Sequence, residues 1–205
     1  GLLGLSEHVN ASSLLAAYSK GIFPWPIDEL DGIPWFCPPK RAVLFLDELH
    51  VPKRLQRLQR KSAYEFRLSQ QTRQVIEACA NSKHRATEGT WISDELIEAY
   101  SAFAQQGYCY SIECYNAAEE LVGGLYGVAI DRMCSGESMF YLENGASKLC
   151  LLHLFGLLRE LGIRWFDCQQ LTPLLEAFGA RELARKDFLE LLEETKGENK
   201  PLFPR

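Results

Sequence analysis

An acid and an amide stand two residues apart in the segment IRWFDCQQ, which begins at Ile163. The apolar residues of this segment predict a buried strand over 163–169. Residues two apart on a strand share a face, with backbones about 7 Å apart, so the side chains of Asp167 and Gln169 can meet. Asp167 could accept a hydrogen bond from the Gln169 NH2 and leave the amide carbonyl toward a substrate. A satisfied buried polar pair explains the two residues equally well.

Other residues with chemical potential lie elsewhere in the chain. Glu137 stands between small and apolar residues in SGESMF, where a carboxylate could bind a cationic group. An acid at a solvent-facing strand end is the simpler explanation. Trp25, Trp35 and Trp91 offer flat faces that could stack on a nucleotide base, although single tryptophans more often belong to the core.

Basic residues gather in one part of an otherwise acidic chain. The net charge is −5, yet the stretch from Lys53 to Arg73 holds seven basic residues and one acid. PKRLQRLQR (52–60) predicts a short helix with Pro52 in its first turn and the leucines and arginines on different faces. Five cations between 53 and 61 repel one another unless an anion is near. We therefore favour a nucleic-acid backbone contact over an ordinary solvated face.

The remaining pattern predicts a mixed α/β fold. Capping signals and periodicity predict helices at 12–20, 70–80, 93–106 and 146–161, with Ser12 or Ser13 and Ser93 as N-caps. Alternation predicts strands at 42–46, 108–115, 120–130 and 133–140, and a short helix and a last one near 185–195 follow strand 163–169. Such an order implies a mixed sheet with a helix packed on it. Along that long helix an apolar stripe indicates core, or a pocket if something opens it: Leu151, Leu154 and Leu158.

The segment from Gly21 to Leu44 contains five prolines and two tryptophans. So much proline argues against regular structure, and the segment is predicted to be a rigid aromatic loop. We place a domain boundary there, with a small N-terminal domain over 1–39 and the main domain over 40–205.

Length and composition narrow the class of protein. The chain has 205 residues, of which 47% are apolar, and no apolar run approaches the 18 or so residues of a membrane span. Its N-terminal stretch does not match a secretory signal, and because Gly1 stands first the natural chain could begin upstream. The seven cysteines include no CxxC pair, which indicates reduced, buried thiols of a cytosolic protein and neither disulfides nor a metal site.

Several short blocks, taken together and in order, carry a resemblance over nearly the whole chain. They are LLAAYSKGIFPW (14–25), RAVL with ELHV (41–51), EGTWIS (88–93), LVGGLYGVA (121–129), GESMF (136–140), ASK (146–148), DCQ (167–169) and FGA (178–180). The sequence thereby resembles the leucyl/phenylalanyl-tRNA–protein transferase family of bacteria.

This resemblance implies a cytoplasmic enzyme of the N-degron pathway that works without a cofactor. Family members move Leu or Phe, and less readily Met, from aminoacyl-tRNA to the α-amine of proteins that begin with Lys or Arg. An adaptor then delivers the tagged protein to an ATP-dependent protease. The implied fold is a GNAT-like acyltransferase domain beside a small N-terminal domain.

The resemblance also implies roles for individual residues. Asp167 and Gln169 match the catalytic pair of the family. Positions that line the site for the aminoacyl end of tRNA and the acceptor are matched by Trp25, Trp91, Tyr100, Gly136 and Glu137. The apolar amino-acid pocket is matched by Leu125, Met139, Leu151, Leu154, Leu158 and Phe166. The tRNA-contacting surface is matched by Lys53, Arg54, Arg57, Arg60 and Lys61. Strand alternation places Phe166 opposite Asp167, so a bulge or a strand end must intervene if Phe166 lines the pocket.

Some residues depart from the family pattern, and two other functions compete. SEHVN (6–10), Tyr141 and Gly145 replace the residues that the family usually has there, which bears on acceptor preference. A CoA-dependent acyltransferase would carry (R/Q)xxGx(G/A) before the central helix, but Leu142 stands where Arg or Gln is needed. A tRNA-binding module without catalysis would bind tRNA and leave the aminoacyl group in place.

Overall fold

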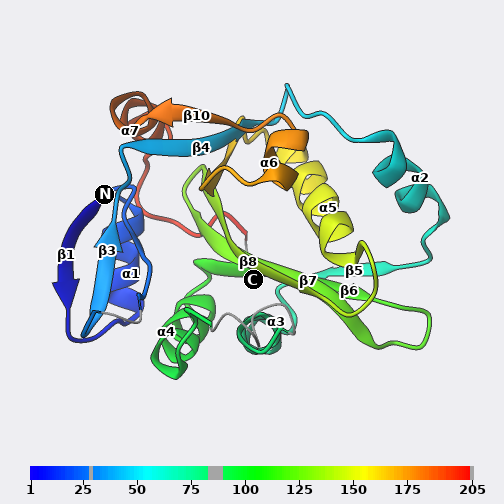
Figure 1. Cartoon of the computed structure of the whole chain (residues 1–205), viewed down its shortest axis with the longest axis horizontal. Helices are drawn as coiled ribbons and strands as arrows, with labels where there is room; N and C mark the ends of the chain where they lie inside the picture. The colour runs from blue at the N-terminus through cyan, green and yellow to red at the C-terminus, as the bar shows by residue number, and fades with distance from the viewer. Residues whose placement is uncertain (28–29, 83–89, 204–205) are drawn as a thin grey trace.

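The computed structural model describes residues 1–27, 30–82 and 90–203, which form two sheets with helices around them (Figure 1). The larger sheet has, in spatial order, strands β10 (Arg181–Ala184), β4 (Lys40–Phe45), β9 (Trp165–Gln169), β8 (Met133–Tyr141), β7 (Leu121–Ile130), β6 (Cys109–Tyr115) and β5 (Glu65–Leu68). All neighbours are antiparallel except β8 and β9, which are parallel. The prediction of a mixed α/β fold is confirmed.

Helices cover both faces of the larger sheet (Figure 1). Helix α5 (Ala146–Glu160) connects β8 to β9 and packs on β6, β7 and β8. From the other face α3 (Thr72–Ala80) packs on the same strands, and α4 (Asp94–Gln105) packs beside it. Because β7 has buried side chains on both faces, Leu125 joins the α5 core and Tyr126 joins the α3–α4 core. The sheet is thus buried on both sides, as a central βαβ unit requires.

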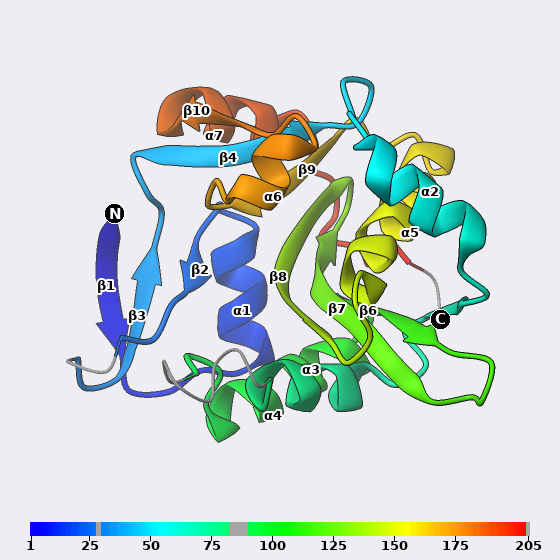
Figure 2. The same ribbon diagram turned by 45° about the vertical axis from the view of Figure 1, so that its right-hand side comes forward.

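Three shorter helices lie toward the ends of this sheet. Helix α2 (Lys53–Lys61) packs on α5, α6 (Pro173–Ala177) follows β9, and α7 (Arg185–Glu193) packs on β10 and β4. Figure 2 shows α2 and α7 at opposite sides of the molecule. No helix among the described residues is both long and apolar enough to cross a bilayer.

The N-terminal segment forms a three-stranded sheet and one helix. Strands β1 (Leu2–Ser6), β3 (Ile33–Phe36) and β2 (Phe23–Pro24) pair in that order, beside α1 (Ala11–Tyr18). The predicted aromatic loop is therefore wrong for 23–24 and 33–36. Proline is tolerated because β2 ends at Pro24, and because the Pro34 carbonyl still accepts from the Trp25 N–H at 3.0 Å.

The helix boundaries differ from the prediction at one cap. The N-cap of α1 is Asn10, whose side chain accepts from the Ser13 N–H while the Ser13 hydroxyl accepts from the Asn10 N–H, so neither Ser12 nor Ser13 is the cap. Ser93 does cap α4, as expected. The seven cysteines are all buried and free, in agreement with the prediction of reduced thiols.

Candidate active site

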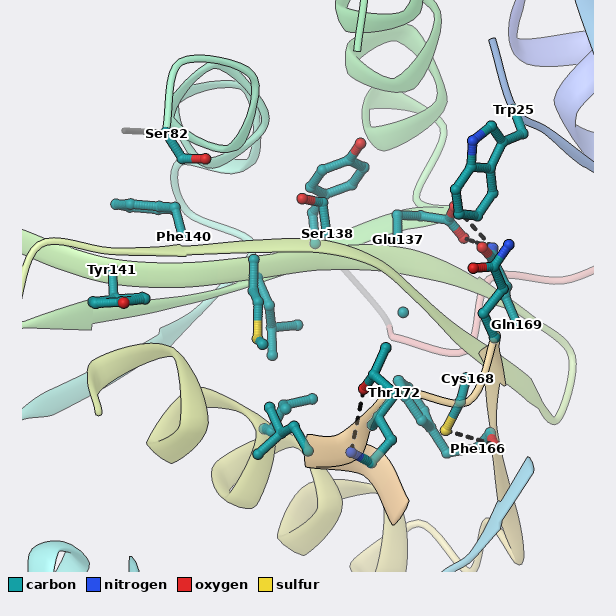
Figure 3. A pocket seen from close by; sticks show the side chains of 18 residues that line it. Trp25, Ser82, Glu137, Ser138, Phe140, Tyr141, Phe166, Cys168, Gln169 and Thr172 are labelled. Atoms are coloured by element: carbon teal, nitrogen blue, oxygen red, sulfur yellow. Dashed lines mark hydrogen bonds between the residues drawn. The ribbon is translucent and has the colours of Figure 1, made fainter. Parts of the chain in front are cut away.

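A cavity of about 390 Å³ opens where β8 and β9 separate (Figure 3). The two parallel strands pair only at Ser135 and Asp167. The β8 residues that line the cavity all follow this point, at 136–141, and Gln169 follows it on β9. Ligand sites of open α/β sheets characteristically lie beyond the carboxyl ends of the strands. The separation of β8 from β9 therefore makes the cavity, and α5 and α6 close it from below in Figure 3.

A β-bulge in β8 directs Glu137 into this cavity. Tyr126 pairs with Ser138 and Gly127 pairs with Gly136, so Glu137 is an extra residue with no partner in the ladder. At the bulge the backbone of β8 lies close to that of the neighbouring strand, β7. A Cβ at Gly127 would lie 1.9 Å from the Ser135 carbonyl oxygen, so only glycine fits there. Figure 3 shows Glu137 and Ser138 on the same side of β8 as a result.

A second irregularity, at the end of β9, turns Gln169 toward Glu137. Ala42 of β4 pairs with Gln169 and Val43 pairs with Asp167, so Cys168 is an extra residue. Gln169 itself has a φ of 59°, in the left-handed region that non-glycine residues rarely adopt. This strained turn lets Gln169 line the same cavity as Phe166, although simple alternation would separate them. The bulge that we expected is present.

The amide of Gln169 is held by Glu137. Its Nε2 donates to both Glu137 oxygens, each at 2.9 Å (Figure 3). The expectation that Asp167 holds this NH2 is wrong, because Asp167 binds the backbone N–H of Gln169, at 2.9 Å. The Gln169 Oε1 has no hydrogen-bond partner within the described part of the chain and is free to accept one. A carboxylate thus holds the Gln169 NH2, but it is Glu137 and not Asp167.

Glu137 is a half-buried acid in a network of hydroxyl groups. Its Oε1 accepts from the Ser135 hydroxyl at 2.9 Å, and its Oε2 lies 3.5 Å from the Tyr100 hydroxyl. Tyr100 in turn is 2.7 Å from the Tyr18 hydroxyl. Burial raises the pKa of Glu137, while hydrogen bonds from Gln169, Tyr18 and Ser135 oppose that rise. The network holds the carboxylate at the polar end of the cavity.

Asp167 lies behind the cavity, where it does not contact the space inside. Its side chain is 2% exposed, and its two oxygens accept from Arg41 Nε at 2.8 Å and Nη2 at 2.6 Å. This is a bidentate pair between fully buried groups. Desolvation is costly for such charges, so loss of one partner would leave the other unpaired in the interior. Sequence analysis missed Arg41, because nothing local links it to a residue 126 positions away.

The apolar part of the cavity comes from four predicted residues and several others. Leu125, Met139, Leu151 and Phe166 line it, as the resemblance implied. Leu154 and Leu158 belong to the core beneath it and do not reach it. Residues that the sequence reading did not select also line it: Ser82, Tyr126, Ser138, Phe140, Tyr141, Cys168, Gln170, Thr172, Leu174 and Leu175. Leu174 and Leu175 are carried by α6, a short helix that offered no functional signal.

Of the aromatic residues predicted to line the site for the aminoacyl end of tRNA and the acceptor, one contacts the cavity and two lie behind it. Trp25 lines the cavity and stacks on Trp91, with centroids 6.1 Å apart and planes at 20°. Trp91 and Tyr100 do not line it, and Tyr100 acts on it through Glu137. Glu88 and Gly89 of the EGTWIS block lie outside the described residues. Trp35 packs in the N-terminal sheet, where its indole N–H donates to the Ser6 hydroxyl at 2.8 Å.

Helix α2 presents its five cations to solvent. Leu55 is buried and Leu58 packs toward Gly145, whereas all five basic side chains are exposed: Lys53, Arg54, Arg57, Arg60 and Lys61. None of the five forms an ion pair with a described residue. Two other exposed arginines of the described chain do form one, Arg73 with Glu77 and Glu98 and Arg181 with Glu48. The charge of α2 is therefore not paired with any acid of the described residues.

Comparison with known proteins identifies the family of this chain. The model of the leucyl/phenylalanyl-tRNA protein transferase family matches residues 43–193, and that of its N-terminal domain matches 9–39. The leucyl/phenylalanyl-tRNA–protein transferase of Colwellia psychrerythraea is 45% identical over 193 residues, which cover 92% of this chain and 79% of that protein. The same enzyme of Nitrosospira multiformis is 43% identical over 194 residues, covering 95% and 82%.

Among solved structures the similarity is weaker. L-PGS from Bacillus licheniformis matches with a TM-score of 0.43 and 15% identity, over 77% of this chain and 48% of that one. The family models and the close relatives agree with each other and cover nearly the whole chain. The chain therefore belongs to the leucyl/phenylalanyl-tRNA–protein transferase family.

Proposed function

We propose that this protein transfers Leu or Phe, and less readily Met, from aminoacyl-tRNA to the α-amine of proteins that begin with Lys or Arg. The observation that carries this proposal is the amide of Gln169 at the polar end of an otherwise apolar cavity, with its NH2 held by Glu137 and its Oε1 bound by no described residue. The transfer marks its product for N-degron proteolysis in the cytoplasm, where charged tRNA is present.

The apolar part of the cavity is suited to the amino acid that is transferred. Leu125, Met139, Leu151 and Phe166 offer contact to an unbranched, branched or aromatic side chain without a polar group that would select one of them. A pocket of this kind distinguishes one methylene by only about 1–3 kcal/mol. Tolerance among Leu, Phe and Met follows from that small difference.

Gln169 and Glu137 are suited to the acceptor. The α-amine has an ordinary pKa of about 7.7–8.0, so a useful fraction is neutral near pH 7. The Gln169 Oε1 accepts from this amine and directs its lone pair to the ester carbonyl carbon. The new C–N bond forms as the bond to the ribose oxygen breaks, and the amine proton ends on that oxygen or on water. The ester is already activated, so the reaction requires neither an acyl-enzyme stage nor a cofactor.

The charge of Glu137 is suited to an acceptor that begins with Lys or Arg. A half-buried carboxylate forms a stronger charge-assisted hydrogen bond than one in water. Two oxygens provide about four acceptor positions, and Gln169 takes one on each oxygen while Ser135 and Tyr100 take one each. The Tyr100 contact is the longest of the four, at 3.5 Å, so an ammonium or guanidinium group can replace it. Helix α2, with its exposed and unpaired cations, is suited to the tRNA backbone.

The direct experiment follows labelled Leu-tRNA or Phe-tRNA with peptides that begin with Lys, Arg, Asp or Ala. We expect label on the first two alone, and none on the Lys peptide when its α-amine is acetylated. Label on no peptide, or on the acetylated one, would overturn the proposal. Stabilisation of the protein by acetyl-CoA in a thermal-shift assay would favour the CoA-dependent alternative.

Gln169→Ala tests the acceptor site itself. We expect transfer to slow by about 100-fold or more, because the amine is no longer positioned, with affinity for aminoacyl-tRNA nearly unchanged. Gln170→Ala is the matched control, since this neighbouring amide also lines the cavity but is exposed. It should keep the wild-type rate within about threefold. Near-normal turnover of Gln169→Ala would contradict the assigned role.

A further inference from the structure

The Asp167 carboxylate controls Gln169 through the backbone. Asp167 Oδ1 accepts from the Gln169 N–H at 2.9 Å, in the turn where Gln169 has its φ of 59°. A non-glycine residue holds such a conformation only where its surroundings impose it. Glu137 fixes the Gln169 side chain from the cavity side. Asp167 fixes the Gln169 backbone from behind, so both carboxylates are needed to aim one carbonyl oxygen.

Arg41 in turn holds the Asp167 carboxylate in place through the side chain. The guanidinium is 1% exposed, and its Nε and Nη2 bind the two oxygens of Asp167. It lies between two aromatic rings, 4.5 Å from the Phe23 centroid and 4.6 Å from the Phe188 centroid. Its Nη1 donates to the Gly21 carbonyl at 3.2 Å. The guanidinium thus contacts two aromatic rings, and each of its three nitrogens donates to a protein oxygen.

These contacts come from three parts of the chain that are distant in sequence. Gly21 and Phe23 belong to the N-terminal unit, Arg41 to β4, and Phe188 to α7. Of these three parts only the N-terminal unit lines the cavity, through Trp25. Arg41 therefore contacts both the N-terminal unit and α7 while it binds Asp167 on β9, the strand that carries Gln169.

We propose that Arg41 is a positioning residue for aminoacyl transfer, which acts through Asp167 on the orientation of Gln169. The proposal rests on the proposed function, since it concerns the same reaction. Asp167, which matches the family's catalytic pair, then also acts through another residue and does not touch the substrate. Phe23 and Phe188 support Arg41 and connect the site to both ends of the chain.

The test compares kcat and KM for aminoacyl-tRNA in Arg41→Lys with those in the wild type. Lysine keeps the charge but loses the two-pronged geometry. A displacement of about 1 Å can reduce the rate by about 100-fold, so we expect a loss of that order in kcat and little change in KM. Asp167→Asn should have the same effect, and it provides a second variant if Arg41→Lys does not fold.

Two further measurements separate positioning from general stability. In a Gln169→Ala background, Arg41→Lys should reduce kcat by less than about threefold more, because residues that act as one unit are not additive. Phe103→Leu, a buried change in α4 without contact to Arg41, should lower the melting temperature and leave kcat unchanged. Independent, multiplicative losses for Arg41→Lys and Gln169→Ala would overturn the proposal, as would a wild-type kcat in folded Arg41→Lys.

These outcomes are distinct from a failure of the proposed function. That function fails if the wild type transfers no label to any Lys or Arg peptide. The inference about Arg41 fails when the wild type is active and folded Arg41→Lys either keeps the wild-type kcat or loses activity independently of Gln169→Ala.

Discussion

At the scale of single residues, the site depends on two carboxylates with different partners. Glu137 is half-buried, binds the Gln169 side chain and faces the cavity. Asp167 is fully buried and is neutralised by Arg41. The two acids therefore differ in their partners, because Asp167 has Arg41 beside it whereas Glu137 forms no ion pair with a described residue. An acceptor that brings a cation would supply that partner, which is one physical reason for the preference for Lys or Arg that we propose.

Glu137→Gln should show how the buried charge of Glu137 affects the stability of the folded protein. Burial raises the pKa of Glu137, so the folded protein holds the proton more tightly than the unfolded chain. Below the unfolded pKa of about 4.3 both states are protonated. As pH rises through the folded pKa, the acid must ionise while buried, and stability falls. The variant cannot ionise, so its melting temperature relative to wild type should increase from pH 5 to pH 8.

The size of this change is about 2–4 °C for each kcal/mol in a chain of this length. Thermal melts at both pH values measure it, with Glu176→Gln, an exposed carboxylate of α6, as the control that should show no such trend. The same Glu137→Gln protein should transfer poorly to Lys and Arg peptides, because the charge that lowers the stability is also the charge that binds the acceptor. An equal difference at pH 5 and pH 8 would contradict the interpretation of Glu137.

At the scale of elements, local sequence patterns predicted what depends on local structure. Strands 108–115, 120–130 and 133–140 and the helix at 146–161 correspond to β6, β7, β8 and α5. Short strands were missed, such as β5 and β10 with four residues each, because alternation over four residues is a weak signal. The bulge at Glu137 and the left-handed turn at Gln169 were not predictable in detail. Both are set by pairing with other strands, and both orient side chains toward the cavity.

The role of α2 is the prediction that belongs to this scale. Arg54→Glu with Arg57→Glu should weaken binding of aminoacyl-tRNA and reduce the slope of log K against log salt by about 1–2, since each lost phosphate contact removes 0.7–0.9. Lys186→Glu with Lys196→Glu makes the same change in charge in and just after α7, on the far side of the molecule (Figure 2). Titrations of both double variants at several salt concentrations provide the comparison.

Equal losses in the two double variants would mean that net charge, and not α2, governs the affinity. An unchanged affinity of the α2 variant at low salt would exclude its contact with the tRNA backbone. Transfer by the α2 variant should recover at high concentrations of aminoacyl-tRNA, because the cavity and its polar end are unchanged.

At the scale of the whole molecule, the N-terminal unit and the main sheet share one core. Leu14 and Tyr18 of α1 lie in the same cluster of buried residues as Val75, Leu96 and Trp165. The proposed boundary near residue 39 is thus a boundary of sheets, with β3 ending at Phe36 and β4 beginning at Lys40. The sequence predicted a domain boundary there, but it could not indicate that side chains on both sides of it pack together.

A shared core predicts that the whole chain unfolds in one transition. Leu14→Ala removes a side chain with no exposure from α1, and Leu154→Ala removes one from α5. Each leaves a cavity and should lower stability by about 2–5 kcal/mol. In calorimetry both variants should shift the same single peak, with equal calorimetric and van't Hoff enthalpies. A separate low-temperature peak in Leu14→Ala would show that the N-terminal unit melts alone. The contacts of Arg41 with Gly21 and Phe23 would then be lost first, and transfer activity should disappear at that lower temperature.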